Sequence, residues 1–292
     1  MLTHRMLALA ALFALAGPGN AADDAPAKQQ AAAEANLKAA KLTLGKGETD
    51  HLLLFAAYPD AKVHAMAATA EKTYMAATKV LKLKDDDVTG KVAITAVPDA
   101  KAYKVFVLQA LKRSPRPKEV SDLKLRGETP YVVFAPTGGK PTADAVAAEA
   151  GELVASGLLS VKAGIATGSE LPGWLEQGFG RAIGLHADGN AAKLTAHKAK
   201  VRALAGKTAG RAFQFTYVWG DAAGGAEFDT LATSFADYLA YGPGADKFAA
   251  FLGGFKPAEG NDSPGVDDAF RAADWKMNEV EAAWKRWAIT GK

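Results

Sequence analysis

Two segments of the chain place a carboxylate, an amide and several small residues at helical spacing. Residues 149–155 read EAGELVA, and residues 171–181 read LPGWLEQGFGR. On a helix, Gly151 and Ala155 lie at i and i+4 on one face, with Glu152 beside them. A carboxylate such as Glu152 acts as a general base when it is held against a reacting group. The simpler interpretation of Glu152 is an ordinary helix carboxylate.

The second segment resembles the zinc-site helix W-L-x-E-G-x-A of the peptidase MA-like gluzincins, the thermolysin-type zinc metallopeptidases. In that family the Glu of this helix is the third zinc ligand, and an upstream H-E-x-x-H helix supplies two His ligands and the general base. The resemblance aligns Gly151 and Ala155 with the two His, Glu152 with the general base, and Gln177 with the third ligand.

The resemblance keeps the spacing of the family but none of its three metal ligands. Gly and Ala have no donor atom, and a neutral amide is a poor replacement for a carboxylate in a zinc site. Without the metal, nothing lowers the pKa of the attacking water. The resemblance therefore implies a degenerate family member with no catalytic residues, metal or cofactor. It also implies that the side-chain positions of Gly151, Ala155 and Gln177 converge between two packed helices.

Hydrophobic periodicity predicts an α+β fold, with a small N-terminal sheet and helices followed by a mainly helical, zincin-like C-terminal half. Strands are expected at residues 50–57, 91–97 and 129–135, and helices at 60–83, 98–111, 141–159, 172–185, within 227–251 on both sides of Gly242-Pro243-Gly244, and at 276–290. The segment at 129–135 takes the place of the family's edge strand, which binds substrate by strand addition.

The N-terminal residues predict export. A cationic Arg5, an apolar run and a small-x-small end make residues 1–21 a signal peptide, with an uncleaved anchor as the alternative. Residues 22–47 are an Ala/Lys-rich flexible spacer or a weak alanine-driven helix. The zincin-like domain then divides into an N-terminal α/β part at 48–140 and a helical part at 141–292 that carries the relic active-site helices. The protein is expected to be periplasmic or extracellular, with no stable membrane insertion after cleavage.

The amino-acid composition limits the classes of binding partner and of metal site that we expect. The 35 Lys and Arg nearly balance the 32 Asp and Glu and are interleaved with them, so we expect no nucleic-acid partner. The chain has no Cys, which removes thiolate sites and disulfides. His186 and His197 flank a glycine-containing turn and could contribute to a non-standard metal site.

Three functional hypotheses remain open. The first is an exported, non-catalytic peptidase-like protein that binds a peptide or protein. The second is a metal-dependent hydrolase with unusual ligands such as Glu149, Glu152, Glu176 or His186. The third is a structural protein of the cell envelope without a small ligand.

Overall fold

The computed structural model describes residues 25–138, 141–165, 171–187, 189, 191–207 and 226–291. The expected signal peptide lies outside these residues, so export stays a prediction. Among the helices that are described, none is long and apolar enough to cross a membrane.

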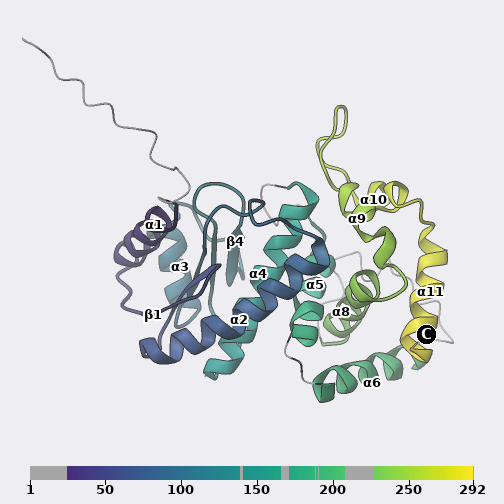
Figure 1. Ribbon diagram of the computed structural model, residues 1–292, viewed down its shortest axis with the longest axis horizontal. Coiled ribbons are helices and arrows are strands. Elements are labelled where there is room, and N and C mark those ends of the chain that lie inside the picture. The colour runs from purple at the N-terminus through teal and green to yellow at the C-terminus, as the bar shows by residue number, and fades with distance from the viewer. Residues whose placement is uncertain are drawn as a thin grey trace, which may run out of the picture.

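The described chain folds into one mixed sheet and a larger helical part (Figure 1). The strands are β1 (Gly45–Glu48), β2 (Leu52–Ala56), β3 (Val92–Ala96), β4 (Ser121–Lys124) and β5 (Tyr131–Phe134). The helices are α1 (Ala25–Ala39), α2 (Asp60–Leu81), α3 (Ala100–Gln109), α4 (Ala143–Ala163), α5 (Gly173–Ala187), α6 (Ala191–Lys207), α8 (Ala226–Tyr241), α9 (Ala245–Gly253), α10 (Val266–Ala272) and α11 (Met277–Thr290). The α+β class with a helical C-terminal half is confirmed.

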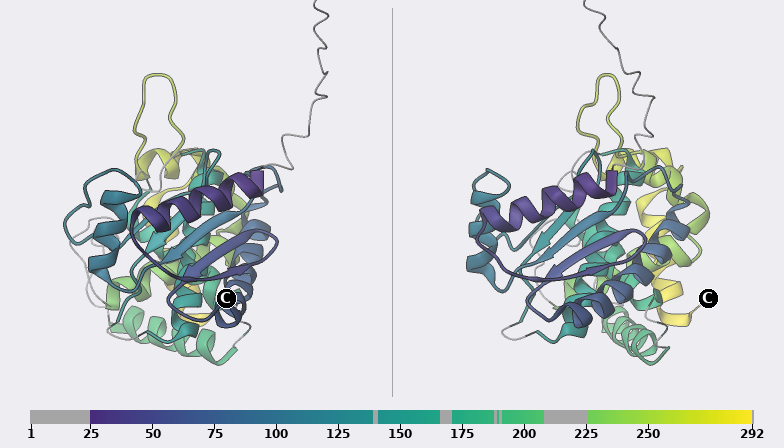
Figure 2. Two further views of the ribbon diagram at one scale, coloured as in Figure 1. Left: turned by 90° about the vertical axis from the view of Figure 1, so that its left-hand side faces the viewer. Right: turned by 60° about the vertical axis from the view of Figure 1, so that its left-hand side comes forward.

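The sheet has the order β1-β2-β3-β5-β4. Its three central strands β2, β3 and β5 are parallel, and each edge strand runs antiparallel to its neighbour. The central strands are apolar on both faces, as parallel strands covered by helices must be. Helices α2 and α4 pack on one face, and α1 and α3 cover the other (Figure 2).

The long helices start and stop where the sequence supplies caps. The Thr142 hydroxyl accepts a hydrogen bond from the N–H of Ala145 at the start of α4, and Gly164 ends this helix in the left-handed conformation, with φ of 79°. Asp99 caps α3 in the same way as Thr142 caps α4. Along α2 the buried side chains recur at helical spacing, which gives the helix one face for the sheet and α4.

The expected flexible spacer is wrong for the described residues from 25 onward. Residues 25–39 form α1, whose Ala33 and Leu37 are buried in the cluster with α3 and the second face of the sheet. The alternative interpretation, an alanine-driven helix, agrees better with the observed α1. Gln29 ties α1 to two distant loops, because its side-chain amide donates to the carbonyl oxygens of Thr89 (2.5 Å) and Glu128 (3.2 Å) and accepts from the N–H of Lys91 (2.6 Å).

Two further expectations about the sheet are corrected. The boundary at residue 48 would separate β1 from the sheet, although β1 pairs with β2 along its whole length. The strand at 129–135 is not an edge, because β5 pairs with β3 on one side and with β4 on the other. The edge beside β5 is β4, a short polar strand that the hydrophobic pattern did not reveal.

The contacts of Gln29 generate a first prediction. Gln29→Ala leaves the Lys91 N–H and the Thr89 and Glu128 carbonyl groups, which are partly buried at these bonds, without these partners; an unsatisfied buried group costs about 1 to 3 kcal/mol. We expect the free energy of unfolding, measured by urea denaturation, to fall by about 2 to 4 kcal/mol. Gln30→Ala is the matched control, because Gln30 makes only an exposed bond to Glu34. Equal losses in the two variants would contradict the docking role of Gln29.

Candidate functional site

Helix α5 lies between α4 and α8 at distances that only glycine permits. A Cβ built on Gly180 would lie 2.3 Å from the carbonyl oxygen of Glu152 on α4. One built on Gly178 would lie 2.5 Å from the carbonyl oxygen of Ala232 on α8. Both are far inside van der Waals contact, so the two glycines set the helix spacing. The Gly-rich segment at 171–181 thus has a packing function that needs no metal.

The three positions that the resemblance aligns with zinc ligands do not converge on one point. Gly151 is buried against α2, where an added Cβ would lie 2.8 Å from the Thr73 Oγ1 atom. Ala155, one turn further along the same face of α4, is also fully buried. Gln177 is exposed on α5. The expected convergence is therefore wrong, because Gly151 faces the α2 interface while Gln177 is exposed to solvent.

Glu152, which the resemblance aligns with the family's general base, lies on the α5 side of α4. Its Cγ would be 3.2 Å from a Cβ at Gly184, so its side chain extends along α5. Burial raises the pKa of Glu152 to about 7. The positive charge of nearby Arg181 lowers this pKa in part, and the negative charge of Glu149 raises it further. Arg181 itself forms an ion pair with Asp229 of α8 at 2.7 Å. Glu149 accepts a hydrogen bond from the N–H of Thr137 (3.1 Å) after β5.

Glu176 is a second carboxyl near the crossing of α4 and α5, but it lies on a different side of this crossing from Glu152. The Ser156 hydroxyl of α4 donates to the Glu176 carbonyl oxygen at 2.9 Å, which fixes the start of α5 on α4. Burial raises the pKa of the Glu176 side chain to about 8, and the Arg116 guanidinium opposes this rise. Arg116 belongs to the loop before β4, so the carboxyl of Glu176 faces the β4 end of the sheet.

The two His candidates both lie near Asp237 of α8. His186 pairs through Nε2 with Asp237 Oδ1 at 2.7 Å, and its ring stacks on Tyr241 with centroids 3.8 Å apart. His197 and Asp237 both line a small cavity of about 40 Å³ between α6, α8 and α11. Burial lowers the pKa of His197. Sequence reasoning missed Asp237, which no motif marks.

The residues proposed for an unusual metal site therefore lie at three places: Glu149 with Glu152, Glu176 beside Arg116, and His186 with Asp237. Within the part of the chain that the structure describes, no three His, Cys, Asp or Glu side chains are placed to hold a metal ion.

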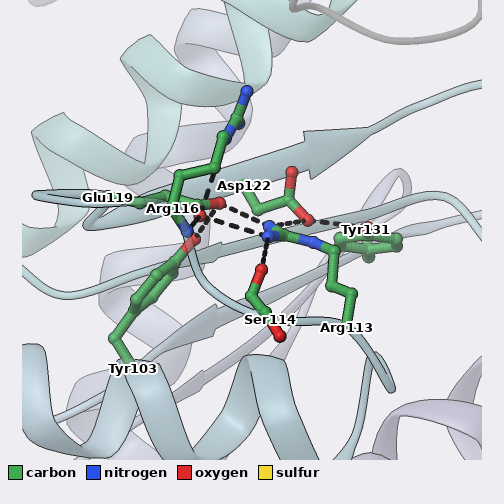
Figure 3. Close-up of polar contacts among 7 residues, drawn as sticks. All are labelled: Tyr103, Arg113, Ser114, Arg116, Glu119, Asp122 and Tyr131. Carbon is green, nitrogen blue, oxygen red and sulfur yellow. Dashed lines mark hydrogen bonds and ion pairs between the residues drawn. The ribbon is translucent and has the colours of Figure 1, made fainter.

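A polar network fixes the loop that leads into β4 (Figure 3). Glu119 is 5% exposed and accepts hydrogen bonds from Arg113, from the Arg116 N–H and from the Tyr103 hydroxyl. Arg113 also pairs with Asp122 at 2.8 Å. Burial opposes ionisation of Glu119, but these donors outweigh it and hold its pKa at about 2. The Nε of Arg116 also pairs with Glu119 Oε2 at 3.6 Å, while the tip of its guanidinium extends away from the other side chains of the network.

The outer side of β4 presents unpaired backbone groups. Ser121 stands opposite Phe134 and Leu123 opposite Val132 in the antiparallel pair with β5. The Ala135 N–H donates to the Val120 carbonyl oxygen at 2.8 Å, so hydrogen-bonded pairs fall at alternate positions from residue 120. Ser121 and Leu123 therefore direct their N–H and C=O groups outward, where no other described strand pairs with them.

Exposed cations surround this edge. Between residues 112 and 126 the cationic side chains outnumber the two carboxylates, of which Glu119 pairs with Arg113 and Arg116, and Asp122 pairs with Arg113. The exposed members of this set are Lys112, Arg116, Lys118, Lys124 and Arg126. The even spread of charge inferred from the sequence is thus locally wrong, because this short segment gathers positive charge at one sheet edge.

Comparison with protein-family models, with curated proteins and with solved structures gives no match to this chain. The functional argument consequently depends on the geometry of the site.

The buried carboxyls generate a prediction about pH. Because the folded-state pKa values of Glu152 and Glu176 are raised to about 7 and about 8, the folded state binds more protons than the unfolded state above pH 4.5. The free energy of unfolding should therefore fall as the pH rises from 4.5 to 8. Glu176→Gln and Glu152→Gln should each stabilise the protein at pH 8, by on the order of 2 kcal/mol, and change it little at pH 4.5.

Denaturation at the two pH values measures this difference, with the exposed Glu259→Gln as control. A loss of stability at pH 8 in both buried variants would show that the ionised carboxylates are stabilised by the fold, contrary to this account.

Proposed function

We propose that the protein is a non-catalytic, peptidase-like binding protein that acts after export and takes up an extended acidic peptide along the outer edge of β4. One observation carries the proposal: a short edge strand combines outward backbone groups with exposed cationic side chains. A peptide that adds to a sheet edge gains main-chain hydrogen bonds, and its side chains give specificity. Acidic side chains on the added strand would come close to Lys124 and Arg126.

The polar network before β4 supports this role because it holds the edge in place before a ligand arrives. A strand that is already ordered loses little conformational entropy on binding, which favours affinity. Arg113 pairs with Glu119 and Asp122, and Arg116 also pairs with Glu119, so two cations balance the two carboxylates beside this strand and reduce their repulsion of an acidic ligand. The exposed Lys118, Lys124 and Arg126 form no ion pair with another described residue and are left for the ligand.

The outward backbone groups favour a peptide over a nucleic acid. Ser121 and Leu123 offer carbonyl acceptors as well as N–H donors, and a peptide strand satisfies both kinds. Phosphate oxygens accept hydrogen bonds but cannot donate to the outward carbonyl groups. Nucleic-acid binding is therefore an outcome of the test below and not part of the proposal.

The peptidase MA-like relationship is part of the proposal and rests on the motif at 171–181 and on the packing of α5 against α4. A non-catalytic protein is favoured because a His at Gly151 would collide with Thr73 unless α2 moved. The signal-like residues 1–21 support export, to the periplasm or the cell exterior. A hydrolase with unusual ligands stays the alternative, and stoichiometric zinc in protein purified without chelator would favour it.

Ser121→Pro tests strand addition directly. Proline removes the outward N–H and places its ring on the free edge, while the ladder to β5 keeps its bonds. We expect a fluorescent peptide of alternating Glu and Val to bind the unchanged protein in an anisotropy titration, and to bind Ser121→Pro about tenfold more weakly. Lys124→Gln should weaken binding less, and added salt should weaken it further.

Ser121→Ala is the matched control, because it keeps the N–H and should bind the peptide normally. A peptide of alternating Lys and Val tests whether the site prefers acidic ligands. A single-stranded oligothymidylate tests whether it prefers peptides to nucleic acids. The proposal is wrong if the cationic peptide binds as well as the acidic one, or if only the oligonucleotide binds. Failure of all three probes would favour the structural-protein alternative.

A further inference from the structure

A cavity of about 270 Å³ lies where the ends of α2 and α4 meet α8 and α9. No residue of β4 lines it. Its inner wall includes Leu81, Phe248 and Leu252, which are almost completely buried. Lys82 and Lys162 line the same cavity. The site therefore combines an apolar wall with two cationic side chains.

Both ammonium groups are uncommitted within the described structure. No ion pair or hydrogen bond joins the Lys82 or Lys162 side chain to another described residue. The usual partners of lysines at helix C-termini are the last carbonyl groups. Here those carbonyls already accept from backbone donors, Lys79 from the Lys82 N–H and Val161 from the Gly164 N–H. The helix ends thus do not require either ammonium.

Lys82 also occupies a backbone conformation that suits glycine better. It ends α2 with φ of 51° and ψ of 46°, the left-handed region in which a Cβ is unfavourable. Glycine at this position would serve the helix end at lower conformational cost. A lysine here is consistent with a use for its side chain, although other lysines of this chain, Lys41 among them, adopt the same conformation.

We propose that this cavity binds a free single-chain amphipathic carboxylate, with the chain against the apolar wall and the carboxylate between Lys82 and Lys162. Ligand cavities usually span about 300 to 1,000 Å³, so this one suits a slender chain and not a bulky ring system. One anionic group, Asp246 in the first turn of α9, also lines the cavity and opposes the ligand's charge. Removing that charge should strengthen binding.

Isothermal titration of the full mature chain with decanoate tests the proposal, with decyltrimethylammonium as the probe of opposite charge. Lys82→Gly and Lys162→Gln should each weaken decanoate binding about fivefold, the upper end of what an exposed ion pair contributes. Asp246→Asn should strengthen it. Lys82→Gly should also keep or raise the midpoint of thermal unfolding, since glycine suits the left-handed position.

Lys41→Gly is the matched control, because it removes the same charge and the same left-handed side chain at the end of α1, outside the cavity. It should leave decanoate binding unchanged. The proposal is overturned if decanoate does not bind, if the cationic probe binds as tightly, or if Lys41→Gly and Lys82→Gly weaken binding equally.

Discussion

The architecture depends on the close approach of α5 to two neighbours at once. Gly180 brings α5 against α4, the helix on the sheet, and Gly178 brings it against α8, the centre of the helical half. Any side chain at either position would meet a backbone carbonyl, which cannot move without shifting a whole helix. Trp174 and Phe179, both buried on α5, then pack against Phe235 of α8 and Phe248 of α9. Helix α5 therefore packs against both the sheet side and the helical part of the molecule, at a spacing that two glycines determine.

This packing separates groups that a catalytic centre would have to bring together. Because the Gly151 face of α4 is buried on α2 and the Glu152 face is used by α5, these neighbouring residues serve different interfaces. Glu176 faces the β4 end, and His186 faces Asp237 on α8. The outer edge of β4 stays accessible, because the network around Glu119 fixes this strand and no other described strand pairs with its outer side. Binding at an edge needs order and charge but no metal.

The sequence predicted the elements whose pattern is strong and local. The apolar strands β2, β3 and β5, the periodic helix α2 and the capped helix α4 were all expected near their observed bounds. It did not predict β4, because a short polar strand has no hydrophobic signature, nor the docking of α1, which depends on contacts of Gln29 with loops distant in the chain. The motif at 171–181 marked a real helix crossing, but the direction in which Gly151 and Gln177 face depends on tertiary packing that no spacing reveals.

Amide hydrogen exchange at β4, followed by NMR with and without the acidic peptide of alternating Glu and Val, tests the central claim most directly. In the free protein the outward amides of Ser121 and Leu123 should exchange quickly, while those of Asp122 and Lys124, which face β5, should be protected. Strand addition predicts that the peptide slows exchange selectively at Ser121 and Leu123. Binding that leaves these two amides unchanged, or that protects another surface instead, would contradict the account.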